Sequence, residues 1–143
     1  MAAVDVQSLR VRREAVVNAH IEAEAVKHDV TAALATFHHP RYEVPATGVI
    51  ADGSEAVENF LRGVLGAYPD LWLRPLKMYH ADDAVIVECM WGGTHLGPLP
   101  DLAPTGRAMQ VESVLIFVFD DDRLICEKLY FDRATIRQQL GVN

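Results

Sequence analysis

The feature that most limits the possible folds of this chain is a change in hydrophobic period near residue 71. Before that point apolar residues recur at helical spacing, whereas from Leu71 onward they alternate with a period of two. Turn-forming residues at HADD and DDDR divide this second part of the chain. Both alternating sets in its last three strands are largely apolar, so both faces of the sheet need cover. The strands are expected near 71–79, 83–95, 109–119 and 123–131.

Two helical segments precede these strands, and a short one follows them. Residues 5–36 have helical periodicity, which ends at the HHP motif at 38–40 because the residue before a proline leaves the α region. RYEV then predicts a short strand, and 53–68 predicts an amphipathic helix with Ser54 as its N-cap. The tail, ATIRQQLGVN, predicts one or two helical turns. This order predicts a single α+β domain over residues 1–143, with a curved antiparallel sheet wrapped around the N-terminal helices.

Charge and apolar runs exclude several classes of protein. The net charge of -7 and the lack of any long Lys/Arg run argue against a nucleic-acid partner. No apolar run approaches about 18 residues and no signal-peptide core is present, so we expect a cytoplasmic protein without a membrane partner. Cys89 and Cys126 lie in apolar runs, which favours two buried free thiols. No zinc-binding spacing occurs, and we expect no metal and no cofactor.

His20, Glu24 and His28 are spaced i, i+4, i+8 in the first helical segment and line one stripe beside core-facing residues. One interpretation is a proton relay or a stripe that contacts substrate. The other is a solvated helix edge with a Glu–His pair of small energetic value. The spacing is not that of a zinc protease helix, whose two histidines are four residues apart with a glutamate next to the first.

Glu88 interrupts the apolar run AVIVECMW in the middle of a predicted strand. An ionised carboxylate in that place needs a partner, a cavity, or a proton held by a raised pKa. A carboxyl group that faces a cavity suits general acid–base catalysis. The alternative is a structural carboxylate paired with an arginine or a histidine.

His95 closes the same strand and precedes a loop rich in proline and glycine. Strand alternation puts His95 on the face of Trp91 and on the opposite face from Glu88. A β-bulge at the glycine pair 92–93 would shift the register and bring both side chains toward one pocket. The sequence alone leaves this question open.

Four polar residues mark the last two strands. Glu112 shares a face with Gln110 and faces either solvent or a partner chain. On the final strand, Tyr130 and Asp132 share one face and Glu127 lies on the other. Asp132 precedes RATIRQQL, which makes it a good N-cap.

Several motifs together give the chain a family resemblance. They are HIEAEAVKHDVTAALATF, YPD, GTHLG, PTGR and FDDDRLICEKLYFD, and they span nearly the whole sequence. In this combination the chain resembles the SnoaL-like polyketide cyclase branch of the nuclear transport factor 2 superfamily. The resemblance implies a cone-shaped α+β barrel with an apolar pocket, paired as a homodimer through the outer face of its sheet. His95 would then lie at the pocket wall, and the loop PLPDLAPTGR would shape the pocket's mouth.

The chain departs from the family pattern at one position. In the polyketide cyclases that it resembles, the histidine assists an aspartate on the following strand, which acts as acid and base without a metal or cofactor. Counting from PTGR, the corresponding residue here is Leu115, which cannot transfer a proton. Either another carboxylate replaces it, with Glu88, Glu112 and Asp132 as candidates, or the chemistry is not aldol cyclisation.

Three functions stay open on this basis. The first is a cofactor-free cyclase, isomerase, lyase or hydrolase that acts on a small, largely apolar carbonyl or ester compound, such as a polyketide-like intermediate. In that case Glu88 or Asp132 would be the base and His95 the polarising donor, and Tyr130 would donate to an oxyanion. The second is a non-catalytic protein that binds a small molecule in the same pocket. The third is an interaction protein that works through its dimer sheet. In the first two, the apolar wall would be formed by Trp72, Trp91, Leu115 and Phe117.

Overall fold

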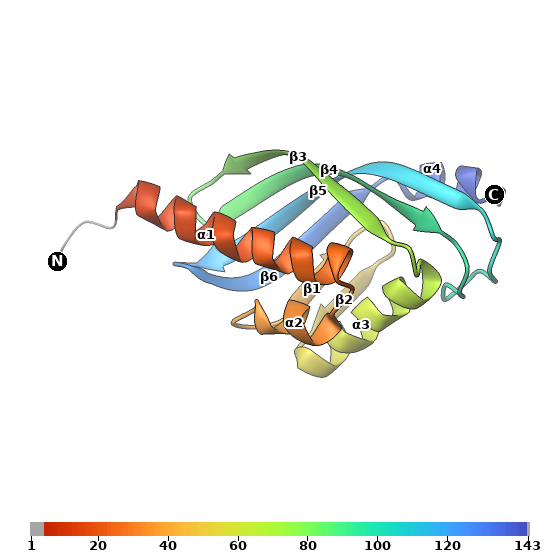
Figure 1. Ribbon diagram of the computed structural model, residues 1–143, viewed down its shortest axis with the longest axis horizontal. Helices are drawn as coiled ribbons and strands as arrows, with labels where there is room; N and C mark the ends of the chain where they lie inside the picture. Colours follow the sequence, from red (N-terminus) through yellow and green to blue (C-terminus); the bar gives the residue numbers. More distant parts are fainter. Residues whose placement is uncertain (1–4, 143) are drawn as a thin grey trace.

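The computed structural model describes residues 5–142, which form a six-stranded sheet and the helices that pack on it (Figure 1). The strand order is β2-β1-β6-β5-β4-β3, and every neighbouring pair is antiparallel except β1 and β6. The elements are α1 (Val6–Ile21), the π-helix η1 (Glu22–Val26), α2 (Val30–Ala35), β1 (Arg41–Val44), β2 (Val49–Asp52), α3 (Ser54–Ala67), β3 (Trp72–His80), β4 (Ala84–Thr94), β5 (Ala108–Asp120), β6 (Arg123–Phe131) and α4 (Arg133–Gln139).

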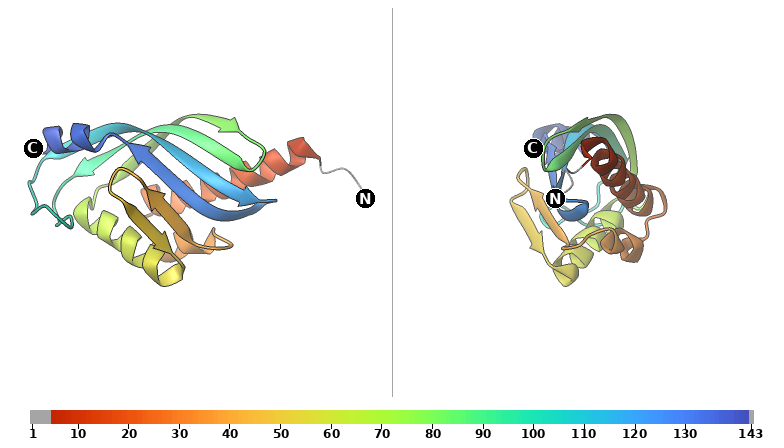
Figure 2. Two further views of the ribbon diagram at one scale, coloured as in Figure 1. Left: turned by 180° about the vertical axis from the view of Figure 1, so that it is seen from behind. Right: turned by 90° about the vertical axis from the view of Figure 1, so that its left-hand side faces the viewer.

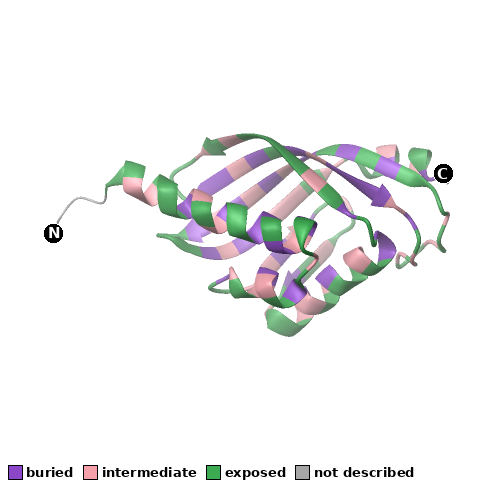
Figure 3. Cartoon of the chain, viewed as in Figure 1, coloured by how far each residue is buried: buried purple, intermediate pink, exposed green. Residues whose placement is uncertain are grey.

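The predicted α+β fold and its four long strands are confirmed. The sheet curves over α1, α2 and α3, as the end-on view in Figure 2 shows. Burial alternates along β4 and β5, so that one set of side chains faces the helices and the other faces outward (Figure 3). The sequence analysis did not predict β2 or the parallel pairing of β1 with β6.

The first helical segment is not continuous, as 5–36 had suggested. It divides into α1, η1 and α2, and the break lies at His28, whose backbone has a φ of 52°. Asp29 N-caps α2 by accepting a hydrogen bond from the Ala32 amide at 3.0 Å. Hydrophobic periodicity continues across this break because all three pieces contribute buried residues to the same core cluster, which explains why the pattern suggested one helix.

The predicted N-cap of α3 is wrong by one residue. Ser54 is the first residue of the helix, and Gly53 occupies the cap position without a side-chain hydrogen bond. Gly53 has a φ of 89°, a conformation that glycine adopts at little cost. The turn between β2 and α3 therefore selects glycine as the cap residue.

Buried apolar side chains form two clusters. The larger cluster lies between the sheet and α1, α2 and α3, and it includes Val17, Val57 and Phe117. The smaller one lies around Tyr68 and Trp91, toward the end of the sheet that carries α4. Both cysteines are free and buried, as expected. Burial raises the pKa of Cys89 and of Cys126 to about 12, so both thiols stay neutral and neither is a nucleophile near pH 7.

Candidate functional site: a buried His–Glu–Glu–Tyr cluster

A narrow cavity of about 50 Å³ lies between the inner face of the sheet and the segments η1 and α3. Such a volume holds a few water molecules, since one water needs about 10–15 Å³. Its polar lining residues are Glu24, Tyr42 and Glu127. The rest of the wall is apolar and consists of Ala25, Phe60, Val64, Leu71, Leu73, Trp91, Leu115 and Leu129.

A β-bulge in β6 turns Glu127 toward this cavity. Two consecutive residues of β5 pair with Leu124 and Cys126, so Ile125 is an extra residue on β6. Beyond the bulge, Glu127 pairs with the inward-facing Phe117 and is only 3% exposed. Without the extra residue, alternation from Leu124 would direct Cys126 inward and Glu127 outward.

Three other elements bring partners to Glu127. Tyr42 lies opposite Glu127 because β1 pairs with β6 in parallel. His20 lies in the last turn of α1, and Glu24 follows it in η1. Short π-helical turns of this kind occur often at functional sites. The Nε2 atom of His20 lies 2.9 Å from Oε2 of Glu24, so the predicted i, i+4 pair exists and points inward.

Both ring nitrogens of the fully buried His20 have hydrogen-bond partners. Nδ1 lies 2.8 Å from Oγ1 of Thr36. That hydroxyl group donates its one hydrogen to the carbonyl oxygen of Ala33, at 2.6 Å. Thr36 must therefore accept from His20, so Nδ1 carries a hydrogen.

The same reasoning applies to the other nitrogen. Nε2 of His20 lies 2.7 Å from the hydroxyl oxygen of Tyr42 and 3.3 Å from Oε1 of Glu127. The Tyr42 hydroxyl donates its hydrogen to Oε2 of Glu24, at 2.9 Å. Tyr42 can then only accept from Nε2, and so this nitrogen carries a hydrogen as well. In this arrangement His20 is an imidazolium between two carboxyl groups.

The pKa values of the cluster agree with the hydrogen bonds. Burial by itself lowers the pKa of His20, but hydrogen bonds with Glu127 and Glu24 outweigh it and raise the pKa to about 10. Burial raises the pKa of Glu127 to about 7, against the lowering effect of its bond with His20. Burial and the two carboxylate charges raise the pKa of Tyr42 well above its ordinary value. Near pH 7, Glu127 is therefore the group that gains and loses a proton most readily.

The cluster also has the spacing of a metal site. The nearest donor atoms of His20, Glu24 and Glu127 lie within 4.8 Å of one another, and no other group of this kind occurs among residues 5–142. Together with Tyr42, however, these side chains satisfy one another through hydrogen bonds. The arrangement is thus stable without an ion.

Of the residues expected at the site, Glu24, Trp91 and Leu115 line the cavity. Phe117 is fully buried and packs edge-on against the His20 ring, with the ring centres 5.7 Å apart. His28 does not continue the stripe, because the chain leaves the helix before it. Its Nε2 atom instead bonds the carbonyl oxygen of Leu71 at 2.8 Å.

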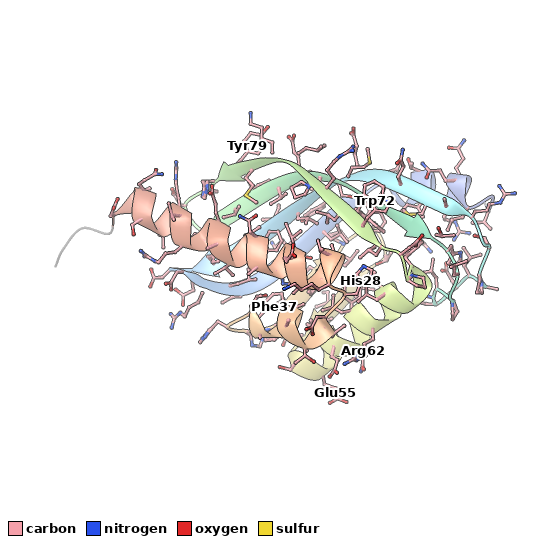
Figure 4. The ribbon with its side chains drawn as sticks, in the orientation of Figure 1. His28, Phe37, Glu55, Arg62, Trp72 and Tyr79 are labelled. Carbon is pink, nitrogen blue, oxygen red and sulfur yellow. The ribbon has the colours of Figure 1, made fainter. Side chains whose placement is uncertain are left out.

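Glu88, Tyr130 and Trp72, which were candidates for the pocket, lie on the outer face of the sheet. Glu88 is exposed on the outer face, opposite Lys77 and Val114, and the expectation that it faces a cavity is wrong. Tyr130 and Trp72 are 42% and 36% exposed, and neither lines the cavity. Figure 4 labels Trp72, at the start of β3. β4 and β5 pair continuously through the glycine pair 92–93, so no bulge changes the register there.

Asp132 and His95 have structural contacts. Asp132 N-caps α4, accepting from the Ala134 amide at 3.0 Å and from the Thr135 hydroxyl at 2.7 Å. His95 is fully buried, but it is not part of the cavity lining. Its Nδ1 accepts a hydrogen bond from the Thr105 amide at 3.2 Å. The histidine at the strand end therefore holds the far side of the 96–106 loop against the strand.

Glu127 and Tyr42 complete the cluster, and the sequence analysis selected neither as a site residue. Glu127 follows LIC in an apolar strand, the same signal that drew attention to Glu88. Alternation correctly put Glu127 and Tyr130 on opposite faces, but it did not say which face is inside. Tyr42 carries no such signal, because a tyrosine in a short strand is ordinary.

A strongly curved sheet wrapped over helices is the nuclear transport factor 2-like fold, which solved structures share with this chain. Within it, the family model of the SnoaL-like polyketide cyclases matches residues 15–140, and the chain belongs to this family. A search of curated proteins finds no match. Among residues 5–142, no helix is long and apolar enough to cross a membrane.

Solved structures share the fold at low sequence identity. A protein of Jannaschia sp. CCS1 assigned to the SnoaL-like polyketide cyclases matches with a TM-score of 0.82 and 17% identity, covering 93% of this chain and 94% of that one. A phenazine biosynthesis-related protein of Pseudomonas aeruginosa matches with a TM-score of 0.81 and 16% identity, covering 100% of this chain and 89% of that one. A protein of Catenulispora acidiphila with a ketosteroid isomerase-like fold was solved with trimethylamine. It matches with a TM-score of 0.75 and 19% identity, covering 90% of this chain and 93% of that one.

Proposed function

We propose that this protein is a cofactor-free acid/base enzyme of the cyclase or isomerase type that acts on a small, largely apolar carbonyl or ester compound. One observation carries the proposal: the His20 imidazolium, Glu24, Glu127 and Tyr42 form one hydrogen-bonded cluster, and the last three of these residues line a mostly apolar cavity. Buried ionisable groups are costly to keep, and perturbed pKa values in a cavity are typical of catalytic acids and bases. Membership of the SnoaL-like family supports the same reaction class.

In this proposal Glu127 is the base, in place of Glu88 and Asp132. Its pKa of about 7 suits a group that must both take and return a proton near neutral pH. Glu127 is a diagonal neighbour of Leu115, since Leu115 pairs with Leu129 and Phe117 with Glu127. A carboxylate from the next strand thus compensates for the leucine at the family's aspartate position.

The chemical step follows from these positions. Glu127 removes a proton from a carbon next to the substrate's carbonyl group, and the electron pair of the broken C–H bond forms an enolate. While Glu127 holds the proton, His20 and Tyr42 stabilise the negative charge that remains in the cluster, on Glu24. In an isomerisation the proton returns to another carbon. In a cyclisation the enolate carbon attacks a second carbonyl carbon of the same molecule, and the new alkoxide takes up the proton.

Proton exchange tests the proposal without knowledge of the natural substrate. We expect the wild-type protein in D₂O to exchange the hydrogens next to the carbonyl group of small apolar ketones such as 1-indanone, as measured by ¹H NMR. Glu127→Gln should slow this exchange by about 100-fold or more, since it removes the general base. Glu88→Gln is the matched control, because Glu88 is an exposed glutamate on the outer face of the sheet, opposite the cavity, and its rate should equal that of wild type.

The alternative is a non-catalytic binding protein that uses the same cavity. It is favoured by the mostly apolar wall and by the hydrogen bonds that already satisfy the cluster. The exchange experiment separates the two. A wild-type protein that binds the ketones, yet exchanges their hydrogens no faster than buffer does, is a binding protein, and the enzymatic proposal is then wrong.

A further inference from the structure

A second hollow, of about 230 Å³, opens to solvent at the end of the sheet that carries α4. Its walls come from the turn before β3 and from β3, β4, β5 and α4. None of the residues that line it also lines the cavity beside Glu127. A ligand of this hollow is therefore separate from the substrate of the proposed reaction.

Small residues leave the space that forms this hollow. Gly93 and Ala108, both among its lining residues, have no side-chain atom beyond Cβ. The neighbouring Gly92 pairs with Trp72 of β3, and the Trp72 indole lies against it. A Cβ atom at Gly92 would overlap the carbonyl oxygen of Met109 and would lie 2.9 Å from Cζ2 of Trp72. Glycine at this position therefore lets the indole lie across β4.

Asp70 gives the hollow a negative charge with a fixed orientation. Its Oδ1 accepts a hydrogen bond from the Thr94 amide at 2.7 Å, and its Oδ2 accepts one from the Thr94 hydroxyl group at 2.7 Å. These two bonds lower the pKa of Asp70, so its carboxyl group is ionised near pH 7. The ion pairs of residues 5–142 do not include Asp70, and no lysine or arginine lines the hollow. Both carboxylate oxygens can still accept a further hydrogen bond.

Trp72 adds an aromatic wall that is 36% exposed. An indole ring attracts a cation more strongly than the other aromatic side chains do. On the same strand, the ammonium group of Lys77 lies 4.8 Å from the ring centre of Tyr79. None of the cation–π contacts of residues 5–142 involves Trp72. The hollow thus combines a carboxylate and an exposed indole, and both favour a positively charged ligand.

The strand register and the polar wall indicate the kind of cation. Trp72 lies beside Gly92 and Asp70 is bonded to Thr94, two residues further along β4. At about 3.3 Å per residue, the two groups are about 7 Å apart along the strand. A planar guanidinium group can stack on the indole and donate hydrogen bonds to the carboxylate across this distance. Gln139, whose Oε1 accepts from the Gln110 amide at 2.8 Å, can accept a second bond. A quaternary ammonium ion has no N–H group with which to use these acceptors.

We propose that this hollow is a second binding site, which holds a guanidinium group stacked on Trp72 and hydrogen-bonded to Asp70. The group can belong to a small molecule or to an arginine side chain of a peptide, since both present the same five N–H donors. Asp70 is exposed, and water weakens the attraction between exposed charges. The dissociation constant for an isolated guanidinium group is therefore expected in the millimolar range.

The experiment uses two probes of nearly equal shape, ethylguanidinium and the uncharged ethylurea. The chain has two tryptophans, hence two indole N–H signals in a ¹H–¹⁵N spectrum, and Trp72→Phe assigns them. We expect ethylguanidinium to move the Trp72 signal along a saturable curve, and ethylurea at the same concentration to leave it in place. The buried Trp91 is an internal control whose signal should not move. N-acetylarginine methylamide distinguishes the two sources of the group, because a peptide site binds it at least tenfold more tightly than ethylguanidinium.

Asp70→Asn keeps an acceptor for the Thr94 amide but removes the charge, and it should weaken the binding of ethylguanidinium by about tenfold or more. Glu112→Gln changes the net charge equally at an exposed residue outside the hollow, and it should bind as wild type does. If Asp70→Asn folds poorly, Trp72→Leu provides the same test, with the Thr94 amide signal as the readout. Equal shifts with ethylguanidinium and ethylurea would overturn the site, as would equal affinities of Asp70→Asn and Glu112→Gln.

Discussion

His20 is the residue on which the electrostatics of the site depend. Its imidazole ring is held from both sides, by Thr36 at Nδ1 and by Tyr42, Glu24 and Glu127 around Nε2. A fully buried histidine would ordinarily be neutral, because burial penalises the charged form. Two carboxyl groups within 3.3 Å reverse that preference here. The positive charge of His20 in turn keeps Glu127 from holding its proton more tightly.

We expect His20 to stay doubly protonated well above pH 7, in line with its pKa of about 10. The ¹⁵N shifts of histidine-labelled protein, followed from pH 5 to 10.5, measure this directly. Glu24→Gln removes one carboxylate partner and should lower the pKa of His20. His39→Gln removes an exposed histidine and should leave the His20 signals unchanged. If the His20 nitrogens lose a proton near pH 6–7, the imidazolium assignment is wrong.

Glu88 and Glu127 show what the sequence can and cannot predict at this scale. Each interrupts an apolar strand, and each was a reasonable candidate for burial. Alternation gives relative faces within one strand, but a single inserted residue exchanges those faces. The bulge at Ile125 does so in β6, and no feature of RLICEKLYF marks it. Which glutamate enters the cavity is thus decided by strand pairing and not by local pattern.

At the scale of elements, short interruptions build the site. The π-helix η1 ends α1 and carries Glu24, and the bulge in β6 carries Glu127. The four long strands could be predicted because their alternation extends over nine or more residues. The interruptions could not, because each changes the pattern by only one residue. Caps are intermediate cases: Asp132 was correctly expected as an N-cap, whereas Gly53 was missed in favour of Ser54.

The cap of α4 allows a prediction at this scale. Asp132→Ala should lower the free energy of unfolding by about 1 kcal/mol, since it removes the acceptor for the Ala134 amide. Chemical denaturation measures the loss. Asp132→Asn keeps an acceptor and should lose much less. Both variants should exchange ketone hydrogens at the wild-type rate, and a large loss of exchange in Asp132→Asn would restore Asp132 as a catalytic candidate.

At the scale of the whole molecule, the fold and family followed from the sequence because they depend on features spread along the chain. Two features were enough to predict the curved sheet: helices that precede a meander of long strands, and the motifs GTHLG and PTGR at their spacing. The cluster needed long-range information. Tyr42 meets Glu127 only because β1 joins the sheet in parallel beside β6, a pairing that neither strand's own sequence specifies.

The buried cluster also makes the stability of the whole fold depend on pH. Folding raises the pKa of His20 from 6.5 to about 10, so its contribution is complete below pH 6.5 and is lost as the pH rises toward 10. Folding raises the pKa of Glu127 from 4.5 to about 7, and this contribution is lost as the pH rises from 4.5 through 7. Both effects lower the stability of the fold as the pH rises. Glu43, Asp52 and Asp70 have lowered pKa values, and their contributions are constant once the pH exceeds about 5.

The melting temperature should therefore fall steadily from pH 5 to pH 9, as measured by calorimetry at constant ionic strength. The cysteine thiols, with pKa values raised from 9.0, add no slope below about pH 8, and between pH 8 and 9 they add to the fall. Glu127→Gln has no carboxyl group to titrate at this position, so its melting temperature should change less between pH 5 and 7 than that of wild type. Glu88→Gln, altered at an exposed carboxylate, should keep the wild-type slope. A wild-type melting temperature that is flat or rising across this range would mean that folding does not raise the pKa values of His20 and Glu127. The proposal of an acid/base cluster would then be wrong.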